Sequence, residues 1–538
     1  MPSTPPCTGP GCQAEFPSSA SCFIIRTLQV DTAPTTKMTR RMHIDTPDRP
    51  STLGNTEKRL SVLMNSIPID RFIGDTDIEV TGVQSYSRNI HKDNLFVAIK
   101  LEKDGHTYIA DAIAKGATAA LCEELPRTLA DGVTYIQVKD SKEALGKIAS
   151  RFYGNPSERI RLIGVTGTNG KTSTATLLYD LFERLGHKVG LLSTVENRIA
   201  GRVEKASITT PTAVPLNRML AEMLEQGCTH CFMEVSSESI DQKRVSGLRF
   251  SGIIFTNISH DHLDYHKTFQ SYWQTKKKLF DSLPDLTWVL LNKDEERAAD
   301  MVRDCAAVCH GYAIDTEADF RAQVLSCSFE GLQLAVNSYE IKSKLVGLFN
   351  AYNITASFAA ALLLGEKREA VKQALSDIRP PKGRFDLYKA KSGRCAIVDY
   401  AHSPDALDAV LSTLNALKKE NQRVITVVGC GGERDQEKRP KMAKAALEQS
   451  DLLIITSDNS RGEDPEAILD DMMSGLSADA LTKVERITNR KAAIDRAVAL
   501  SNTNDLILVA GRGHETVQEI ANVDHFFDDM TEVKLSLI

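Results

Sequence analysis

Short apolar runs that end in polar or glycine-rich clusters recur along most of this chain. Four lie beyond residue 394, in the order CAIVDYAH, VITVVGCGG, LLIITSDNS and LILVAGRGHE, and three lie between residues 188 and 259, as KVGLLSTV, THCFMEVSS and SGIIFTNIS. Such runs are typical of strands buried on both faces of a parallel sheet, and the helical patterns between them predict an α/β fold. Because such sheets bind ligands at the carboxyl ends of their strands, the polar clusters stand where a site is expected.

The same pattern divides the chain into segments. Residues 1–55 are rich in Pro, Ser, Thr and Arg and show no sustained periodicity, so they are predicted to form a disordered extension. An organelle transit peptide and a start codon placed too early, with Met38 or Met42 as the true start, are both compatible with this composition. The rest is predicted to fold as three α/β domains, at 56–155, 156–380 and 381–538.

Composition excludes several classes of protein. The chain has 538 residues, of which 42% are hydrophobic and 25% charged, and its net charge is −6, which gives no bulk reason to expect binding to nucleic acid or to a membrane surface. No apolar run approaches the roughly 18 residues that a membrane-spanning helix needs. The 11 cysteines are scattered, which is typical of a reducing compartment. The Cys228–Cys231 pair is interpreted as packing, as are Cys305, Cys309 and His310.

The stretch GVTGTNGKTSTATLL, residues 164–178, predicts a phosphate-binding loop. It joins an apolar strand to a helix through Gly167, Asn169 and Gly170, so backbone N–H groups and the helix N-terminus can hold an anion. Lys171 can neutralise a terminal phosphate, and the hydroxyl of Thr172 can ligate Mg²⁺. The stretch departs from the strict G-x-x-x-x-G-K-[ST] pattern, because valine stands at its first glycine position.

Two further polar clusters follow neighbouring strands. MEVSSESIDQKRV supplies Glu234, and TNISHDHLDYHKTF supplies His262 among several acidic and imidazole groups. A carboxylate and an imidazole at adjacent strand ends can share a cation with phosphate oxygens, and a site with so few protein ligands favours Mg²⁺ over zinc. The lysine run 276–278 would by composition alone be a solvated helix face.

These and other motifs occur in the order found in the Mur ligases, which the chain resembles from about residue 80 to about residue 520. The shared motifs are GTNGKTS, STVENR, TTP, MEVSS, TNISHDHLDYH, GLFNAYN, GRF, DYAHSPD, GCGGERD, DNSR and GRGHE. The resemblance implies a cytoplasmic ATP-dependent ligase of peptidoglycan synthesis, which forms an amide through an acyl phosphate. It also implies a UDP-binding first domain, a central ATPase domain and a Rossmann-like third domain that brings the amino acid, in a chain expected to be a monomer.

The resemblance assigns roles to the central domain. The ATP phosphates would be held by Gly167, Thr168, Asn169, Gly170, Lys171, Thr172 and Ser173, and the rest of the nucleotide would lie near Asn353, Arg384 and His402. Glu234, His262 and Thr172 would ligate Mg²⁺. The family carries a carbamylated lysine in the pattern Y-x-x-x-K-x-x-L-F, which places Lys276 at the modified position, where its carbamate would help to bind a second Mg²⁺.

The resemblance also assigns the substrates, UDP-MurNAc-L-Ala-D-Glu and an amino acid. The sugar nucleotide and its dipeptide would contact Ser87, Thr209, Thr210, Ser236, Gln242 and Arg244. Family members that add meso-diaminopimelate share a D-N-P-R motif whose arginine contacts the distal carboxylate, and this chain has Asp458, Asn459, Ser460 and Arg461 there. Arg434, Gly511 and Glu515 match the remaining contacts. Since lysine has no second carboxylate, Arg461 favours diaminopimelate.

The sequence departs from the family near the sugar nucleotide, and it leaves alternatives open. Glu238 stands where many relatives have histidine, Tyr86 replaces an aspartate, and the loop FVAIKLEKDGH lacks a customary glycine. The alternatives are a lysine-adding Mur ligase, a ligase like folylpolyglutamate synthetase, and a ligase-derived binding protein without activity. Intact Lys171, Glu234, His262 and Lys276 argue against the last.

Overall fold

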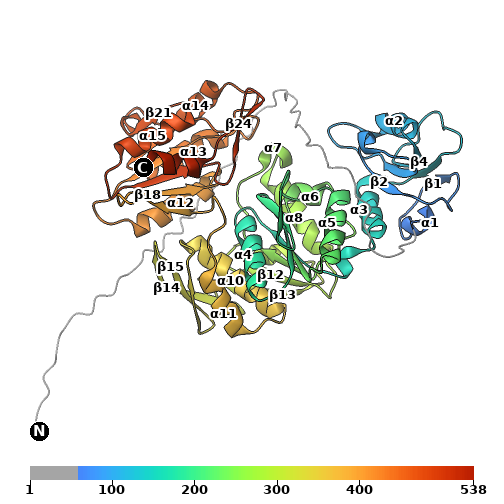
Figure 1. Cartoon of the computed structure of the whole chain (residues 1–538), viewed down its shortest axis with the longest axis horizontal. Coiled ribbons are helices and arrows are strands. Elements are labelled where there is room, and N and C mark those ends of the chain that lie inside the picture. The colour runs from blue at the N-terminus through green and yellow to red at the C-terminus, as the bar shows by residue number, and fades with distance from the viewer. Residues whose placement is uncertain (1–57) are drawn as a thin grey trace, which may run out of the picture. The chain divides into compact units, whose positions relative to one another are not determined.

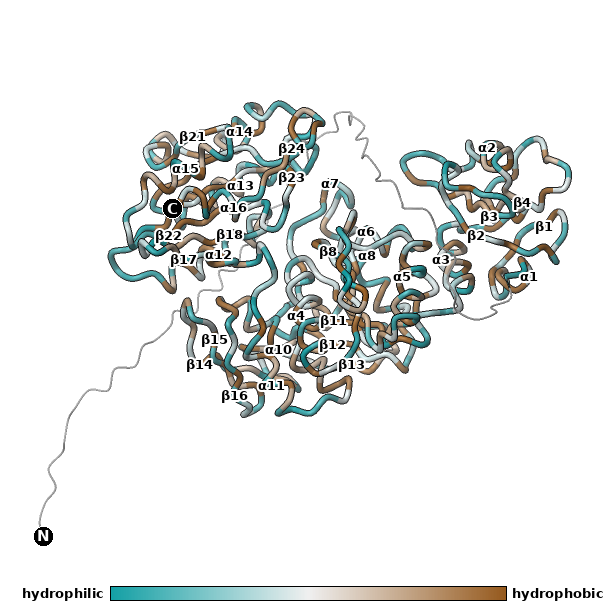
Figure 2. Tube along the Cα trace, viewed as in Figure 1, coloured by the Kyte–Doolittle hydropathy of each residue, from teal (hydrophilic) through white to brown (hydrophobic). Residues whose placement is uncertain are grey.

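The computed structural model describes residues 58–538, so the predicted extension at 1–55 lies outside the described residues. Three main sheets with their own covering helices make up the described chain (Figure 1). Their apolar residues gather on the strands and on the inner faces of the helices, as the hydropathy colouring in Figure 2 shows. The α/β class predicted from the alternating runs is therefore confirmed.

The first sheet has the strand order β1-β5-β4-β3-β2, with β1 antiparallel to β5 and the other pairs parallel. Its strands are β1 (Arg71–Ile73), β2 (Gly82–Gln84), β3 (Asn94–Val97), β4 (Ala117–Cys122) and β5 (Thr134–Gln137). Its helices and 3₁₀ turns are α1 (Leu60–Leu63), η1 (Ser87–Asn89), η2 (Gly105–Tyr108), α2 (Ile109–Ala114) and α3 (Ser141–Phe152). Asp140 begins α3 by accepting a hydrogen bond from the Glu143 N–H, as N-cap residues do.

The central sheet has eleven strands in the order β16-β15-β14-β13-β12-β11-β6-β10-β7-β8-β9. Strands β7 and β10–β14 run parallel with β6, and antiparallel strands close both ends. The strands are β6 (Arg161–Thr166), β7 (Val189–Leu192), β8 (Glu196–Ile199), β9 (Arg202–Lys205), β10 (His230–Glu234), β11 (Gly252–Phe255), β12 (Trp288–Asn292), β13 (Val308–Ala313), β14 (Phe320–Ser328), β15 (Gly331–Val336) and β16 (Tyr339–Ser343).

Helices cover both faces of the central sheet. They are η3 (Pro156–Glu158), α4 (Lys171–Arg184), α5 (Ala213–Glu225), α6 (Ser237–Asp241), α7 (Leu263–His266), α8 (Phe269–Asp281), α9 (Ala298–Met301), α10 (Leu348–Leu363) and α11 (Arg368–Asp377). Side chains alternate between faces along a strand, so Ile163 of β6 packs in the core under α4 and α10 and Leu162 packs in the opposite core under α5 and α8. Burial on both faces explains why these strands are continuous apolar runs.

The third sheet has the order β17-β18-β22-β19-β20-β21, and a separate hairpin, β23–β24, follows it. Its strands are β17 (Asp386–Lys389), β18 (Cys395–Asp399), β19 (Val424–Val428), β20 (Leu452–Ile455), β21 (Val484–Arg486) and β22 (Leu506–Ala510), and the hairpin is β23 (Val517–Ile520) with β24 (Val523–Phe526). Its helices are α12 (Pro404–Leu417), α13 (Lys438–Glu448), α14 (Pro465–Met473), η4 (Ala480–Lys483), α15 (Arg490–Leu500) and α16 (Asp529–Ser536).

Strand register brings the predicted polar clusters to common edges. In the central sheet, Glu234 at the end of β10 pairs with Val165 of β6, and Phe255 at the end of β11 pairs with Thr166. In the third sheet, Ala510 at the end of β22 pairs with the last residues of β18 and β19. In each sheet, the loops that carry the polar clusters therefore begin at one edge. Parallel sheets bind their ligands at this edge, the carboxyl ends of the strands.

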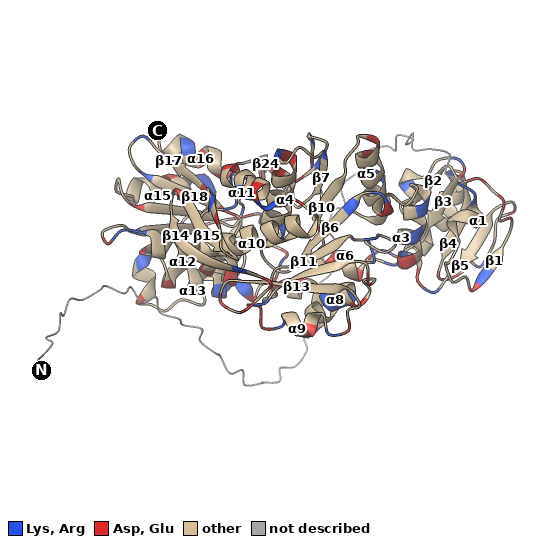
Figure 3. Cartoon of the chain, turned by 90° about the horizontal axis from the view of Figure 1, so that it is seen from below, with Lys and Arg blue, Asp and Glu red and all other residues tan. Residues whose placement is uncertain are grey.

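Surface features agree with most of the compositional predictions. In the described part of the chain, no helix is long and apolar enough to cross a membrane. Charges of both signs are interspersed in the view of Figure 3. Cys228 and Cys231 are buried free thiols in a core, as predicted. Cys309 is an exception, because it is exposed at the start of β13, and its interpretation as a packing residue is wrong.

Candidate functional site

The loop between β6 and α4 has the backbone of an anion cradle. Gly167 has φ +147° and Gly170 has φ +84°, both in the region that favours glycine. A Cβ at Gly167 would lie 2.0 Å from the Thr256 hydroxyl oxygen, so the loop also needs glycine for space. The helix begins at Lys171, and its first N–H groups have no partner within the helix, which leaves them able to bind phosphate.

A neighbouring strand end fixes the shape of this loop. Asn257, just beyond β11, accepts hydrogen bonds from the Thr168 N–H with its carbonyl oxygen and from the Asn169 N–H with Oδ1, both at 2.9 Å. The Thr256 hydroxyl donates to the Asn169 carbonyl at 2.7 Å. These contacts fix the conformation of the loop and use the N–H groups of Thr168 and Asn169, so the donors left for an anion are those at the start of α4.

We expect Gly167→Ala to lower the free energy of unfolding by about 3 kcal/mol, because it combines backbone strain with overlap on Thr256. Gly186→Ala is the matched control, since Gly186 has φ +91° but open space where a Cβ would lie, and it should cost only about 1 kcal/mol. Chemical denaturation followed by fluorescence measures both. Equal losses of stability in the two variants would show that the close approach of the new Cβ to Thr256 does not destabilise the protein.

A half-buried lysine, Lys171, and a buried one, Lys276, meet at this loop. The Lys171 ammonium donates to the carbonyls of Gly167 at 3.0 Å and Thr168 at 2.8 Å, and the Lys276 ammonium donates to the same Gly167 carbonyl at 3.0 Å. Burial lowers the pKa of both side chains, and the charge of Lys171 lowers that of Lys276 further. Two lysine side chains that share one acceptor fit an anionic ligand, which would stabilise the charged form of each.

Lys276 lies on the buried face of α8 and not in solvent. Its side chain is 1% exposed, and its ammonium lies 4.8 Å from the ring centre of Tyr272. Tyr272 in turn shares a 3.0 Å hydrogen bond with the Thr168 hydroxyl of the phosphate loop. The solvated-face interpretation that composition alone gives is therefore wrong for Lys276, and the position singled out by the family pattern is the buried one.

Glu234 and His262 lie at the edge where the predicted metal site would form. Glu234 is fully buried and accepts hydrogen bonds from the Thr194 N–H at 2.7 Å and its hydroxyl at 3.1 Å, and its negative charge raises the pKa of Lys171. His262 has a left-handed backbone, φ +56°, and its Nε2 lies 3.6 Å from an oxygen of Asp261. Burial lowers the pKa of His262, which favours the neutral imidazole that ligates metals.

The donor set fits a hard cation that keeps water or phosphate in its shell. Among residues 58–538, no group of three or more His, Cys, Asp or Glu side chains is arranged to hold a metal. A carboxylate, an imidazole and the Thr172 hydroxyl are few ligands, which suits Mg²⁺ bound together with phosphate oxygens. Burial would raise the pKa of Asp261, but the positive charge of Lys438 and the backbone N–H of His262 help to hold it well below its usual range.

The predicted nucleotide contacts are linked to the phosphate loop. Arg384 donates to the Thr172 hydroxyl at 3.0 Å, and its guanidinium lies 4.5 Å from the ring centre of Tyr400. Asn353 on α10 accepts from the Thr174 hydroxyl at 3.2 Å. His402 Nδ1 lies 2.8 Å from the Tyr400 carbonyl, and burial, with the charge of Lys438, lowers its pKa to about 4. Ser173 lies half-buried on α4.

Loops of the third domain form a second polar cluster around Asn459. Its Oδ1 accepts from Arg512 Nη1 at 2.7 Å and from the Glu519 N–H at 2.9 Å, and its Nδ2 donates to Glu515 at 2.8 Å. Burial and the charge of Asp458 raise the pKa of Glu515. The negative charges of these two carboxylates favour a cationic group nearby, and Arg512 already lies 3.5 Å from Glu515.

Arg461 projects from the same cluster with a strained backbone. Its φ is +52°, its N–H donates to the Glu519 carbonyl at 3.1 Å, and its Nη1 donates to the Gly432 carbonyl. Gly511 lies close to Asp458, since a Cβ there would approach Asp458 Oδ2 at 2.9 Å. The Ser460 hydroxyl is buried and has no partner among the described residues, which is consistent with a position that can also take proline.

Most of the residues predicted to bind the sugar nucleotide and its dipeptide lie in one cluster, and Ser87 lies outside it. Thr210 donates to the Glu234 carbonyl at 2.7 Å and accepts from the Ser236 N–H at 3.1 Å. Arg244 donates to the Thr210 carbonyl at 3.0 Å and to Gln242 Oε1 at 2.7 Å. Thr209 joins them through a hydrogen bond from the Thr194 hydroxyl at 3.2 Å. Ser87 lies apart, on η1 of the first domain, and bonds Asp111.

Comparison with known proteins identifies the family. Models of three of its parts match this chain: "Mur ligase family, catalytic domain" at residues 79–153, "Mur ligase middle domain" at 165–361 and "Mur ligase, glutamate ligase domain" at 383–513. The UDP-N-acetylmuramoyl-L-alanyl-D-glutamate–2,6-diaminopimelate ligase of Bacteroides fragilis is 49% identical over 477 residues, which cover 88% of this chain and 98% of the relative. The chain belongs to the Mur ligase family.

Other relatives of this Mur ligase carry the same name. The enzyme of Cytophaga hutchinsonii is 50% identical over 464 residues, which cover 86% of this chain and 95% of the relative. A solved structure of a UDP-N-acetylmuramoyl-L-alanyl-D-glutamate–2,6-diaminopimelate ligase superposes with a TM-score of 0.64 at 28% identity, over 89% of this chain and 98% of the other. Within the family, these matches place the chain in the MurE branch, as its ordered motifs predict.

Sequence reasoning missed several residues that shape the site of this Mur ligase. Asn257 and Thr194 position the phosphate loop and Glu234, and both stand just beyond a strand, so the strand-end rule alone could have found them. Tyr272 and Tyr400 contact the site through packing and hydrogen bonds. Both stand in shared motifs, Y-x-x-x-K-x-x-L-F and DYAHSPD, but no local pattern shows that a buried aromatic residue contacts a site, so neither was given a role.

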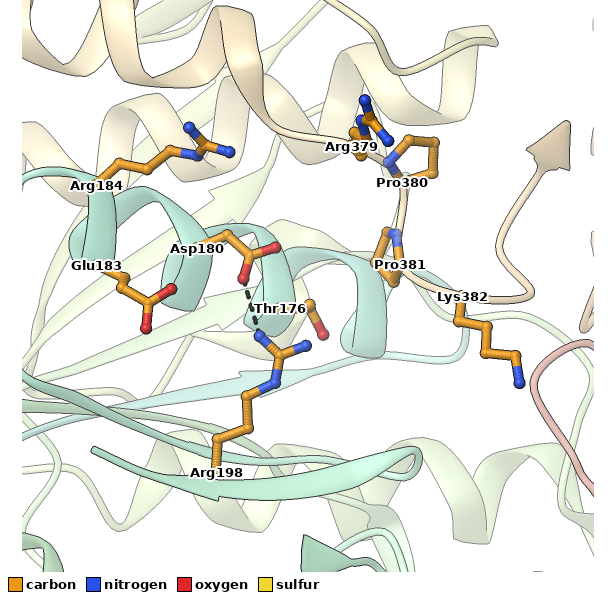
Figure 4. A pocket seen from close by; sticks show the side chains of 9 residues that line it. All are labelled: Thr176, Asp180, Glu183, Arg184, Arg198, Arg379, Pro380, Pro381 and Lys382. Atoms are coloured by element: carbon orange, nitrogen blue, oxygen red, sulfur yellow. Dashed lines mark hydrogen bonds and ion pairs between the residues drawn. The ribbon is translucent and has the colours of Figure 1, made fainter. Parts of the chain in front are cut away.

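A cavity of about 490 Å³ lies beside the segment that links the central and third domains. Its lining comes from one face of α4, from Arg198 of β8 and from residues 379–382, and none of the predicted site residues lies in it (Figure 4). Asp180 and Arg198 form a 3.0 Å ion pair across it. Because no residue of the phosphate loop lines this cavity, the cavity is not the predicted phosphate site.

Proposed function

We propose that this Mur ligase adds meso-2,6-diaminopimelate to UDP-MurNAc-L-Ala-D-Glu, with hydrolysis of ATP to ADP and phosphate, in peptidoglycan synthesis. The observation that carries the choice of amino acid is the cluster in the third domain, where the Arg461 guanidinium is bonded to the Gly432 carbonyl and its charge acts on the carboxylate of Glu515. Diaminopimelate differs from lysine by a second carboxylate. A guanidinium placed to bind that group distinguishes the two amino acids.

The chemistry follows two steps. The terminal carboxylate of the dipeptide attacks the γ-phosphorus of ATP, the bond to the β-phosphate oxygen breaks, and an acyl phosphate and ADP form. The amine of diaminopimelate then attacks the acyl carbon, loses a proton, and expels phosphate as the amide forms. Lys171 and the N–H groups of the phosphate loop stabilise the negative charge during the first step.

Two further groups support the phosphate site. Glu234, His262 and the Thr172 hydroxyl would hold Mg²⁺, which supplies positive charge to the phosphate oxygens. Lys276, as the neutral amine, would react with CO₂ to give a carbamate and one proton, so that the side chain becomes an anion able to help bind a second Mg²⁺. Two observations support this modification: the side chain is buried, and burial together with the charge of Lys171 lowers its pKa well below the usual lysine value, which favours the neutral, nucleophilic amine.

The sugar nucleotide would lie between Ser87 of the first domain and the cluster around Thr210 and Arg244. That cluster adjoins Glu234 through the Thr210 hydrogen bond, which supports a position of the dipeptide end near the phosphate loop. We further propose that the enzyme is a monomer and works in the cytoplasm, where its nucleotide substrates are made.

Phosphate release tests this function. The purified chain with ATP, Mg²⁺ and UDP-MurNAc-L-Ala-D-Glu is expected to release phosphate when meso-diaminopimelate is added and to release at least about 100-fold less with L-lysine. Omission of the sugar nucleotide is the control for uncoupled ATP hydrolysis. Release with lysine at the same rate would leave the ligase chemistry intact and overturn the role of Arg461. No release with either amino acid would overturn the proposed function.

A further inference from the structure

Two loops of the third domain carry the arginines that are proposed to bind diaminopimelate. Arg434 follows β19 in the loop GCGGERD, and Arg461 follows β20 in the segment DNSRGED. The loops are in direct contact, since the Gly432 N–H donates to the Asn459 carbonyl at 2.8 Å. A Cβ at Gly432 would lie 2.1 Å from the Ser460 carbonyl oxygen, so the contact allows no side chain there.

Glu463 joins the two loops. It lies two residues beyond Arg461, its own N–H donates to the Ser460 carbonyl at 3.0 Å, and its Oε1 accepts from the N–H of Glu433. Glu433 has φ +53°, a strained conformation that needs support from its surroundings. The residue that follows Glu433 is Arg434, so the carboxylate of Glu463 fixes the backbone from which Arg434 projects.

A buried arginine binds the carboxylate of Glu463. Arg439 on α13 is 1% exposed, and its Nη2 donates to both carboxylate oxygens of Glu463, at 3.0 and 2.8 Å. Its other terminal nitrogen, Nη1, donates at 2.8 Å to Asp471 on α14, which is half exposed. A forked, charge-assisted contact of this kind holds the carboxylate in one orientation.

We infer that Glu463, held by Arg439, is a positioning residue for diaminopimelate: it sets the distance between Arg434 and Arg461 to match the substrate. This inference rests on the proposed function. Glu463 itself uses its oxygens on Arg439 and on the Glu433 N–H, so it contacts the loop and not the substrate. Its influence on the reaction must pass through Arg434.

The test is Glu463→Gln in the full chain. An amide has one acceptor oxygen in place of two, so Arg439 and the Glu433 N–H compete for it and the loop loses its fixed position. The KM for diaminopimelate is expected to rise about tenfold, with the KM values for ATP and the sugar nucleotide within about twofold of wild type. The matched control is Asp471→Asn, which removes the other carboxylate partner of Arg439 without touching the loop, and it should leave all three KM values within about twofold.

A double-mutant cycle and thermal unfolding separate positioning from a general loss of structure. If Glu463 acts through Arg434, then Glu463→Gln should add less than about twofold to the KM for diaminopimelate in an Arg434→Ala background. An equal rise of all three KM values, or the same rise in Asp471→Asn, would overturn the inference. A wild-type enzyme that does not use diaminopimelate would instead overturn the proposed function, which this design distinguishes.

Discussion

Lys276→Ala is expected to lower kcat for ligation by about 10³-fold or more, because the carbamate proposed at this position carries charge next to the transferred phosphate. The structure gives the reason for its reactivity. The side chain is buried against Tyr272, and burial together with the charge of Lys171 lowers its pKa well below the usual lysine value. The lowered pKa favours the neutral amine, which is the form that reacts with CO₂. Steady-state phosphate release measures the loss.

Lys277→Ala is the matched control for this prediction. Lys277 is the next residue on α8, but it pairs with Asp281 and Asp304 away from the phosphate loop, so its removal should leave kcat within about twofold. A carbon-13 resonance from labelled bicarbonate should appear in the wild type and in Lys277→Ala and be absent in Lys276→Ala. Retention of more than a tenth of the activity by Lys276→Ala would contradict the proposed role.

Arg461→Ala is expected to lower kcat/KM for meso-diaminopimelate by about 10²- to 10³-fold, which corresponds to a loss of about 3–4 kcal/mol of transition-state stabilisation. Its guanidinium is held by the Gly432 carbonyl and lies 4.0 Å from Glu519, so it is oriented before substrate arrives. Lysine lacks the distal carboxylate, so the residual rate with L-lysine should stay within about threefold. Competition between the two amino acids in one reaction measures the change in preference directly.

Arg486→Ala serves as the control for charge alone. Arg486 lies in the same domain on β21 and pairs with Glu466 and Asp470 on α14, outside the Asn459 cluster. Its removal alters the net charge by the same amount and should not change the preference between amino acids. Equal losses of kcat/KM with diaminopimelate and with lysine in Arg461→Ala would show that this residue supports the fold of the loop and does not bind the distal carboxylate.

The strands and the phosphate loop could be predicted from the sequence because their signals are local. A strand buried on both faces is a continuous apolar run, and Gly167, Gly170 and Lys171 stand within five residues of one another. The polar clusters after β10 and β11 were also accessible, since the register of a parallel sheet brings strand ends to one edge. Local pattern and tertiary structure agree at these places.

Burial of charge could not be predicted in the same way. Three consecutive lysines on α8 give no sign that only Lys276 faces the interior, because that depends on packing of the helix against the phosphate loop. The contact between Arg439 and Glu463 joins residues 24 positions apart on different elements, and no periodicity marks it. The prediction for Cys309 is wrong in the opposite direction. Its apolar sequence context indicated burial, but its side chain is exposed on β13.

The separation of the two clusters has a consequence for how such enzymes diverge. The groups proposed to recognise the amino acid, from Arg434 to Glu515, lie in loops of the third domain, whereas the phosphate loop and its two lysines lie in the central domain. A third domain exchanged between relatives would therefore carry a new choice of amino acid with it. It would have to retain Arg384 and His402, because both belong to the proposed nucleotide site and Arg384 donates to Thr172 of the central domain.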